Sequence, residues 1–451
     1  MSRKTVVLDG FLSSRIVILL LVIVFISATV AVSTIPQQGD FIEIIGLYSV
    51  AFISYFALAL RSKITLRDIF LIGVLARVIL VFLFPNLSDD LYRFIWDGKL
   101  ISEHINPYSM LPSAYDGASS FMTFLFDEMN SPEYFTIYPP FTQLVFYVSA
   151  LSGEDILLCS KVLKTIFVIA EMGTFFFMVK TLGSLSKRQS LSAIYFLNPL
   201  VLLEGLGNLH FEILMIFFLS ATIYFYFVKK KVFIAIVFFM LSVASKLLPL
   251  MFLPYFLFKE KKENIIKILG IGIPLFVLIF SPVVIGVDFK NFFASIDLYF
   301  QKFEFNASIY YVLRYFGRIL SGYNLIHYIG PLLGVLTVGF IFNKARKADS
   351  LSLSSFIKFA LFSFSIYLFF ATTVHPWYLM VPTFLSVFVE FRYVLLWSYL
   401  IFLSYIHYSY DPVSENFAII ALEYGIVFGY IAIFERRAIF NHEIKSLYPE
   451  R

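Results

Sequence analysis

The feature that most constrains this 451-residue chain is a series of apolar runs, each about as long as a membrane is thick. A bilayer core of about 30 Å needs roughly 20 apolar residues in an α-helix. The runs occupy 15–34, 42–60, 67–84, 160–182, 190–206, 211–228, 264–286, 324–343, 354–372, 376–391, 393–410 and 416–434. They predict an all-α, polytopic integral membrane protein.

The composition supports a membrane protein and excludes several other classes. Hydrophobic residues make up 60% of the chain and charged residues 14%, whereas about a quarter of a soluble domain is charged. The apolar content excludes an intrinsically disordered chain. Cys159 is the only cysteine, which excludes a disulfide scaffold. The basic residues form short clusters between apolar runs, so we expect no nucleic-acid partner.

These basic clusters predict the orientation of the chain, because Lys and Arg gather in the cytoplasmic loops of membrane proteins. The main clusters lie at 187–188, 229–231, 259–262, 344–347 and 436–437. With all of them in the cytoplasm, both termini lie there too, and 85–137 forms a large external loop. We therefore expect any active site to face outward, at the extracytoplasmic surface of the membrane.

The same orientation prevents two apolar pieces from simply crossing the membrane. Segment 138–151 joins two external positions, so it should be re-entrant or lie along the surface. Segment 232–258 has basic clusters at both ends. It must therefore leave and return, and we expect two half-helices that turn near Ser245 and Lys246. The prediction then holds about fourteen membrane elements, including these broken half-helices.

The strongest candidate for chemistry is the start of the external loop, where Asp89 and Asp90 follow Ser88. Ser88 is a good N-cap, and the two acids suit the first turn of a helix. One interpretation is capping with a solvated polar face. The other is a carboxylate that acts as a general base at the membrane surface, with Arg93 one turn on to bind an anion. Adjacent helical side chains point about 100° apart, so a divalent metal is compatible with the pattern but not required by it.

Lys246 is the second candidate, because it interrupts an apolar stretch. An ammonium in a membrane helix costs about 2.5–3.5 kcal/mol on insertion. It snorkels to the membrane surface, pairs with an intramembrane acid such as Glu171, or faces a cavity that binds an anionic ligand. Weaker candidates lie at 375–378 and 198–212, since Trp–Tyr pairs at a membrane boundary more often form an aromatic belt.

Several enzyme classes lack their characteristic motifs in this chain. There is no His-x-x-x-His zinc spacing, no P-loop and no Gly-x-Ser-x-Gly elbow. Nucleotide hydrolysis and serine hydrolysis are therefore not expected.

Short blocks spread over 67–390 resemble one enzyme superfamily when they are taken in order. They are Ser88-Asp89-Asp90-Leu91-Tyr92, Trp96-Asp97-Gly98, Asn106-Pro107-Tyr108, Tyr138-Pro139-Pro140, Leu197-Asn198-Pro199-Leu200 with Glu204 and Gly207-Asn208, Ser245-Lys246-Leu247-Leu248-Pro249, Phe305-Asn306-Ala307-Ser308 and His375-Pro376-Trp377-Tyr378. The chain resembles the GT-C glycosyltransferases that use polyprenyl-phosphate-linked sugars, especially bacterial polyprenyl-phosphate-mannose-dependent mannosyltransferases. It is more distantly similar to the catalytic subunit of GPI mannosyltransferase I.

The resemblance implies a hexosyltransferase of the bacterial inner (cytoplasmic) membrane, with its active site facing outside, that inverts the transferred sugar, with mannose favoured. The partners it implies are a polyprenyl-phosphate sugar donor, a glycan or glycolipid acceptor and membrane lipids. It requires no cofactor, although a divalent metal remains compatible with it. It also divides the chain into a two-span hairpin at 1–66, a GT-C catalytic module at 67–391 that includes the external loop, and C-terminal spans with a cytoplasmic tail at 392–451.

Carried over residue by residue, the resemblance implies three groups of site residues. The general base is Asp89 or Asp90, since the family places an acid in this loop. The expected donor-phosphate residues are Arg93, Lys246, His375 and Tyr378. The expected acceptor or sugar residues are Trp96, Asp97, Tyr138, Glu204, Asn208, His210 and Asn306.

Three alternatives remain open. A transporter or flippase of lipid-linked sugars would share broken helices and an intramembrane lysine, but it would usually show internal repeats, and no clear repeat is visible. A membrane polymerase or ligase predicts a longer loop late in the chain than 288–322. A catalytically inert subunit would not need the acid, the lysine and the His-Pro-Trp-Tyr block together.

Overall fold

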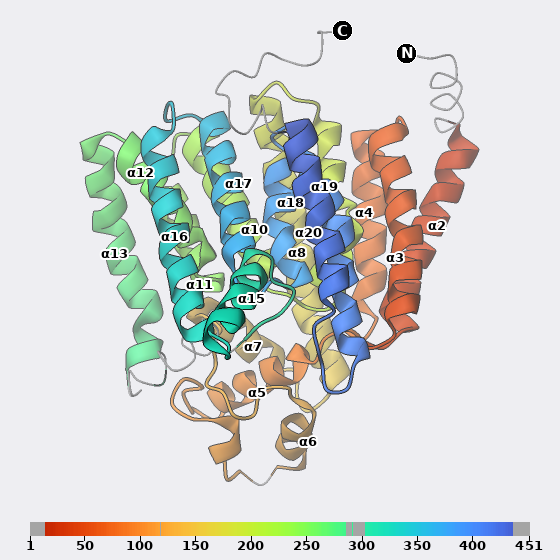
Figure 1. The fold of residues 1–451 in the computed structure, drawn as a ribbon, viewed down its shortest axis with the longest axis vertical. Coiled ribbons are helices and arrows are strands. Elements are labelled where there is room, and N and C mark those ends of the chain that lie inside the picture. The colour runs from red at the N-terminus through yellow and green to blue at the C-terminus, as the bar shows by residue number, and fades with distance from the viewer. Residues whose placement is uncertain (1–13, 118, 286–290, 292–302, 436–451) are drawn as a thin grey trace.

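The computed structural model describes residues 14–117, 119–285, 291 and 303–435, and it confirms the all-α, polytopic class. Most helices lie side by side in one bundle, with α5 and α6 at one end (Figure 1). Within the described ranges, the one isolated β-bridge joins Phe305 to Thr373. The first thirteen residues and the predicted tail after residue 435 fall outside the described part of the chain.

Among the described residues, seven helices are long and apolar enough to cross a membrane. They are α2 (Arg15–Thr34), α3 with its extension (Phe41–Leu60), α8 (Ile156–Ser184), α13 (Lys262–Val284), α16 (Ile326–Lys347), α17 (Leu353–Phe370) and α20 with its extension (Phe417–Glu435). The other predicted elements are shorter or broken: α4 (Leu66–Val81), α9 (Ala193–Phe196), α10 (Glu212–Ile223), α11 (Val232–Ser245), α12 (Leu253–Lys259), α18 (Met380–Ser386) and α19 (Tyr393–Leu400).

Prolines account for two of these breaks. Helix α11 ends at Ser245, and Lys246 has extended backbone, as predicted. Pro249 lies four residues after Ser245, and a proline has no N–H to donate to the carbonyl four residues earlier, so an α-helix cannot continue unbroken through this position. The run at 190–206 was predicted as one span, but it bends by 59° between Gln189–Phe196 and Val201–Gly207. Pro199 lies in this bend, where it cannot donate a helical hydrogen bond.

The two ends of the bundle differ in character. Figure 1 shows α12 reaching the end opposite to α5 and α6. There Lys259 Nζ donates to the carbonyl of Arg346 at 2.8 Å, which brings two of the predicted cytoplasmic clusters together. We call this end the basic edge and the end with α5 (Asp90–Ser102), α6 (Ser120–Glu128) and α7 (Pro140–Ala150) the site edge.

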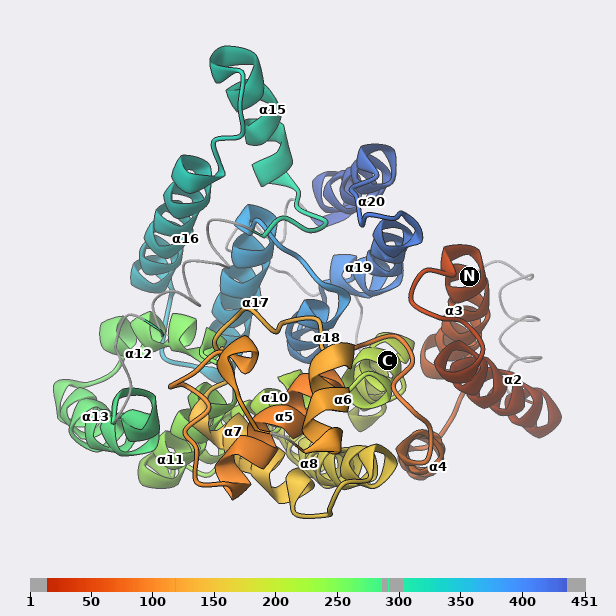
Figure 2. The same cartoon turned by 90° about the horizontal axis from the view of Figure 1, so that it is seen from below.

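The predicted surface piece at 138–151 contains α7, which packs on α5 at the site edge. Eleven residues are too few to cross a bilayer. Helices α5 and α7 touch at Gly98, where an added Cβ would lie 2.3 Å from the carbonyl oxygen of Phe146. Glycine therefore permits the close contact, and Figure 2 shows α5, α6 and α7 covering this end of the bundle.

A buried ion pair joins α4 to α8 inside the bundle. Arg77 Nη2 lies 2.6 Å from Glu171 Oε2, and both side chains are almost fully buried. Arg77 Nη1 also donates to the carbonyl of Phe196 at 2.8 Å, and the Tyr195 hydroxyl donates to Glu171 at 2.7 Å. Glu171 is therefore not the partner of Lys246, the alternative that the sequence left open.

We expect single substitutions in this pair to destabilise the protein, because each leaves a buried charge uncompensated. Arg77→Met or Glu171→Gln should each cost about 3–5 kcal/mol of folding free energy. The double change Arg77→Met/Glu171→Met should recover most of that loss. Thermal unfolding of the purified proteins in detergent measures the effect, and single variants as stable as the unchanged protein would contradict it.

Candidate active site

The site begins at the first turn of α5. The helix starts at Asp90, one residue later than expected, and Ser88 Oγ lies 3.4 Å from the Asp90 backbone N–H. Asp89 occupies the N-cap position, but its exposed side chain makes no capping hydrogen bond. Partial desolvation and the negative charges of Asp90 and Glu128 raise the pKa of the Asp89 carboxyl above its ordinary value. This acid is thus accessible and holds a proton more readily than an ordinary aspartate.

Asp90 instead faces the interior through His210. Asp90 Oδ2 lies 3.9 Å from His210 Nδ1, and Asn130 Nδ2 donates to its other oxygen at 3.4 Å. On the far side of the ring, His210 Nε2 lies 3.3 Å from the fully buried carboxylate of Glu204. The imidazole therefore lies between two acids.

Glu204 is itself held by two neighbours. The Tyr405 hydroxyl donates to it at 2.7 Å, and Asn208 Nδ2 donates at 3.2 Å. Leu209 adopts a left-handed φ of 64°, which ends the helical turn after Gly207 and turns the chain toward His210. Three predicted sugar-binding residues, Glu204, Asn208 and His210, thus form one cluster.

Three further rings continue from His210 in a stack of four that we call the ring column. His210 stacks on Trp377 with centroids 3.6 Å apart, and Trp377 stacks on His375 at 4.3 Å. His375 then stacks on Phe305 at 4.5 Å. Because histidine rings cover both faces of Trp377, this tryptophan serves neither as an open sugar platform nor as part of an aromatic belt.

Lys246 lies beside this column. It forms an ion pair with Glu212, and its ammonium lies 4.9 Å from the centre of the Tyr378 ring. Tyr378 in turn meets His375 edge-on at 5.6 Å. The Lys246 side chain keeps 29% exposure against 2% for Glu212. An ammonium has three hydrogen-bond donors, so the pair leaves capacity for an incoming anion.

The charge state of His375 differs from the prediction that this residue supplies a positive charge to the donor phosphate. Burial, followed by the nearby His210 and Lys246, lowers its pKa to about 3. The ring is therefore neutral at physiological pH, because burial disfavours its charged form and the nearby His210 and Lys246 add to that effect. It can accept or donate a hydrogen bond but cannot act as the cation that the sequence suggested.

The remaining predicted residues of the external segment hold that segment together. Arg93 is buried, and its Nε donates to Asp97 at 2.8 Å while its Nη1 donates to two loop carbonyls at 2.9 Å. Asp97 also accepts from Gln143 at 2.8 Å. Trp96 is 2% exposed, and Tyr138 packs edge-on against Phe94 at 5.1 Å. Arg93 and Asp97 use their polar groups within this segment and Trp96 is buried, which argues against the predicted ligand roles.

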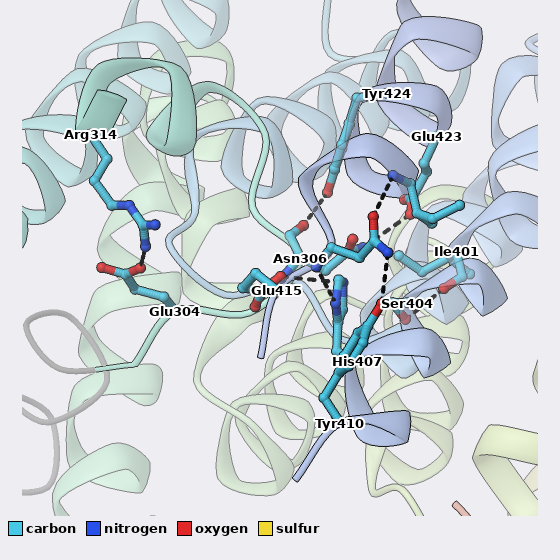
Figure 3. Close-up of polar contacts among 12 residues, drawn as sticks. Glu304, Asn306, Arg314, Ile401, Ser404, His407, Tyr410, Glu415, Glu423 and Tyr424 are labelled. Carbon is cyan, nitrogen blue, oxygen red and sulfur yellow. Dashed lines mark hydrogen bonds and ion pairs between the residues drawn. The ribbon is translucent and has the colours of Figure 1, made fainter. Parts of the chain in front are cut away.

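Asn306, the residue after Phe305 in the chain, lies in a polar network with Glu415, Glu423 and Tyr424 (Figure 3). Its backbone has a left-handed φ of 45°, and its N–H donates to Glu415 at 3.2 Å. Asn306 Nδ2 donates to Glu423 at 3.1 Å, and the Tyr424 hydroxyl donates to the backbone carbonyl of Asn306 at 2.8 Å. Asn306 is 1% exposed. It therefore positions the end of the ring column. The sequence had suggested that Asn306 lines an open sugar site, and its burial argues against that role.

Glu415 gives this network a testable pH dependence. Burial raises its pKa from 4.5 to about 7. A carboxyl with a raised folded-state pKa stabilises the fold at low pH, and this contribution is lost as the pH rises from 4.5 through about 7. We expect thermal stability to fall across this range, and to fall less in Glu415→Gln. Melting curves at several pH values measure the difference, and equal slopes for both proteins would contradict the assignment.

Sequence reasoning missed several residues that complete the site. Glu212 was not paired with Lys246, and Phe305 and Trp377 were seen only as parts of motifs. Glu423 carried a usable signal, since an acid inside the apolar run 416–434 must find partners. Its partners here are Trp397 Nε1, at 2.8 Å, and Asn306.

For metal binding, the described ranges contain no group of three or more His, Cys, Asp or Glu side chains arranged to hold an ion. The polar chemistry of the site is carried by two exposed or half-exposed acids, a buried carboxylate–histidine cluster and a paired lysine.

Comparison with known proteins places the chain in a family. No curated protein sequence matches it significantly. A family model described as MptA_B family, alpha-(1->6)-mannopyranosyltransferase, N-terminal domain, matches residues 22–259. The match covers more than half of the chain and includes Asp89, His210 and Lys246. The chain therefore belongs to the alpha-(1->6)-mannopyranosyltransferase family and so to a family of mannosyltransferases.

Proposed function

We propose that this protein is a GT-C mannosyltransferase that moves mannose from a polyprenyl-phosphate donor to an extracytoplasmic glycan or glycolipid acceptor. The observation that carries the proposal is the convergence of the first turn of α5 and the broken helix at Lys246 on one ring column. A lipid-linked donor also accounts for an active site built at the edge of a membrane bundle, without a nucleotide-binding loop. In this orientation the site edge faces outside and the basic edge faces the cytoplasm.

Lys246 would stabilise the phosphate that leaves with the lipid. Negative charge grows on that phosphate as the bond to the sugar breaks, and a preplaced ammonium stabilises the transition state. Glu212 holds the ammonium in place through their ion pair, and Tyr378 contacts it from another side. Helix α10 also begins beside Lys246, since its first residue is Glu212, and helix N-termini favour nearby anions.

Asp89 is the base that the geometry favours. Its carboxylate makes no capping bond and is exposed, whereas Asp90 is engaged by Asn130 and faces His210. A raised pKa suits a group that must take a proton from an acceptor hydroxyl. Asp90 would act indirectly, by orienting His210 and with it the ring column.

The stereochemistry follows from direct displacement at the anomeric carbon. The acceptor oxygen forms a bond to that carbon, the bond to the phosphate oxygen breaks, and the proton goes to Asp89. The configuration inverts, so an α-linked product, as in the family description, requires a β-linked donor. We propose that no metal is needed, since Lys246 supplies the charge at the leaving phosphate.

The test is transfer by the purified protein in lipid nanodiscs from radiolabelled polyprenyl-phosphate β-mannose to a mannose-ended acceptor, with and without EDTA. We expect an α-(1→6)-linked product in both conditions. Transfer only from a nucleotide sugar would overturn the donor assignment. Movement of the donor across the membrane without transfer would instead favour the flippase alternative.

A further inference from the structure

Helix α15 (Ile309–Ser321) presents its apolar face away from the protein. The exposed side chains are Val312 at 57%, Tyr315 at 64%, Phe316 at 56%, Ile319 at 63% and Leu320 at 86%. At 100° per residue these side chains share one face of the helix. A soluble surface helix has the opposite arrangement, so this face needs an apolar environment.

The opposite face of α15 carries the polar contacts to the rest of the chain. Arg314 pairs with Glu304, and the Tyr310 hydroxyl donates to the same carboxylate at 2.5 Å. Gly317 is buried, where an added Cβ would lie 3.2 Å from Leu325. The helix is therefore attached through its polar side, and its apolar side is left uncovered within the described part of the chain.

The position of α15 selects lipid as the covering partner. Figure 2 shows the helix lengthwise, extending outward from the bundle, whereas α20 is seen close to end-on. Figure 1 places it in the half of the bundle that carries the site edge, beside α16. The span α16 begins at Ile326, shortly after α15 ends at Ser321, so α15 lies near the level where that span enters the membrane.

Aromatic and basic side chains mark the same level. Tyr315, Tyr323 and Tyr328 are 64%, 62% and 73% exposed, and tyrosines gather at membrane–water boundaries. Arg318 is exposed on the polar side of α15, as in helices that lie in the headgroup region. We propose that α15 lies flat in the leaflet at the site edge and anchors the Glu304–Ser308 segment to the membrane surface.

This anchor would fix one end of the ring column. Asn306 and Phe305 come immediately before α15, and Ser308 Oγ donates to the carbonyl of Phe369 at 2.8 Å. A helix held at headgroup height therefore sets the height of Phe305, and with it that of the ring column, relative to the lipid surface.

A depth measurement with spin labels tests the placement. In a Cys159→Ser background, single changes Phe316→Cys and Leu320→Cys probe the apolar face, and Arg318→Cys and Ser321→Cys probe the polar face. Leu278→Cys on α13 serves as a lipid-facing reference and Asp116→Cys as a water-exposed one, since both positions are exposed in the protein. Collision of the nitroxide with oxygen and with a nickel chelate is measured in nanodiscs.

We expect labels at 316 and 320 to collide mainly with oxygen, at a shallower depth than at 278, and labels at 318 and 321 to collide more with the chelate. Chelate access at all four positions would overturn the proposal by placing α15 in water. Labels at 316, 318, 320 and 321 that are all as deep as the label at 278 would place α15 in the hydrocarbon core and would also overturn the proposal. Low access to both reagents at 316 and 320 would indicate a covering protein partner, which also overturns the proposal.

The anchoring role has a separate readout. Leu320→Glu puts a charge on the lipid-facing side, and Ser321→Glu puts the same charge on the other side. We expect Leu320→Glu to accelerate hydrogen–deuterium exchange of peptides that contain Asn306, whose N–H is bonded to Glu415, and Ser321→Glu to leave it unchanged. Equal exchange in both variants would show that the lipid contact does not hold this segment.

Discussion

The substitution Asp89→Asn should lower the turnover number for mannose transfer by about 10²- to 10⁴-fold, the usual contribution of a general base. Asparagine keeps the size of the side chain but cannot take the acceptor proton. Since Asp89 makes no capping bond, the fold should be unaffected. The measurement is steady-state transfer with saturating donor and acceptor, together with a melting curve for each variant.

The neighbouring acid provides the control. Asp90→Asn should cause a smaller loss, because Asp90 acts through His210 rather than on the acceptor. It should leave the acid limb of the pH–rate profile in place, whereas Asp89→Asn should remove it. A larger loss in Asp90→Asn, with that limb abolished, would transfer the base role to Asp90.

The substitution Lys246→Met should lower transfer by about 10²- to 10³-fold, by analogy with the removal of one preorganised electrostatic contact. It also leaves Glu212 buried without its partner, which destabilises the fold. Loss of activity in this variant alone would therefore be ambiguous.

A double variant separates these two effects. Lys246→Met/Glu212→Gln removes the unpaired charge, so its melting temperature should return toward that of the unchanged protein while transfer stays low. Lys246→Arg, which keeps the positive charge, should retain more transfer activity than Lys246→Met or the double variant. Recovery of transfer in the double variant would show that Lys246 serves only to neutralise Glu212.

The membrane-spanning elements were predictable where uniform apolar runs have clear boundaries. Helix α2 covers the predicted 15–34 because Arg15 begins the run and Pro36 follows it. The break at Lys246 was predicted because the charged Lys246 interrupts an apolar stretch that has basic clusters at both ends. The bend at Pro199 was not, since hydrophobicity alone counts the residues of 190–206 as one continuous run.

The site was predictable as a set of segments but not as an arrangement. The motifs identified Asp90, His210, Lys246 and His375, and the structure links these residues through Trp377 and Tyr378. No local pattern states which residue will pair with which, because these contacts join positions far apart in the chain. No local pattern showed that Arg93 pairs with Asp97 instead of binding a ligand. None showed that burial keeps His375 neutral.

The region matched by the family model contains only some of the residues that form the site. Residues 22–259 include both acids of α5, His210 and the Lys246–Glu212 pair. Phe305, His375 and Trp377 lie beyond the matched region, yet they form most of the ring column. The chain after residue 259 therefore completes the ring column beside the acids, His210 and Lys246 of the matched region.

A cryo-EM structure of the Asp89→Asn variant in nanodiscs with polyprenyl-phosphate β-mannose would show directly where the donor binds. We expect phosphate density beside Lys246 and Tyr378, with the sugar extending toward residue 89 and the lipid tail leaving between helices. Donor density at the basic edge, or at the site edge but away from Lys246, would contradict this expectation.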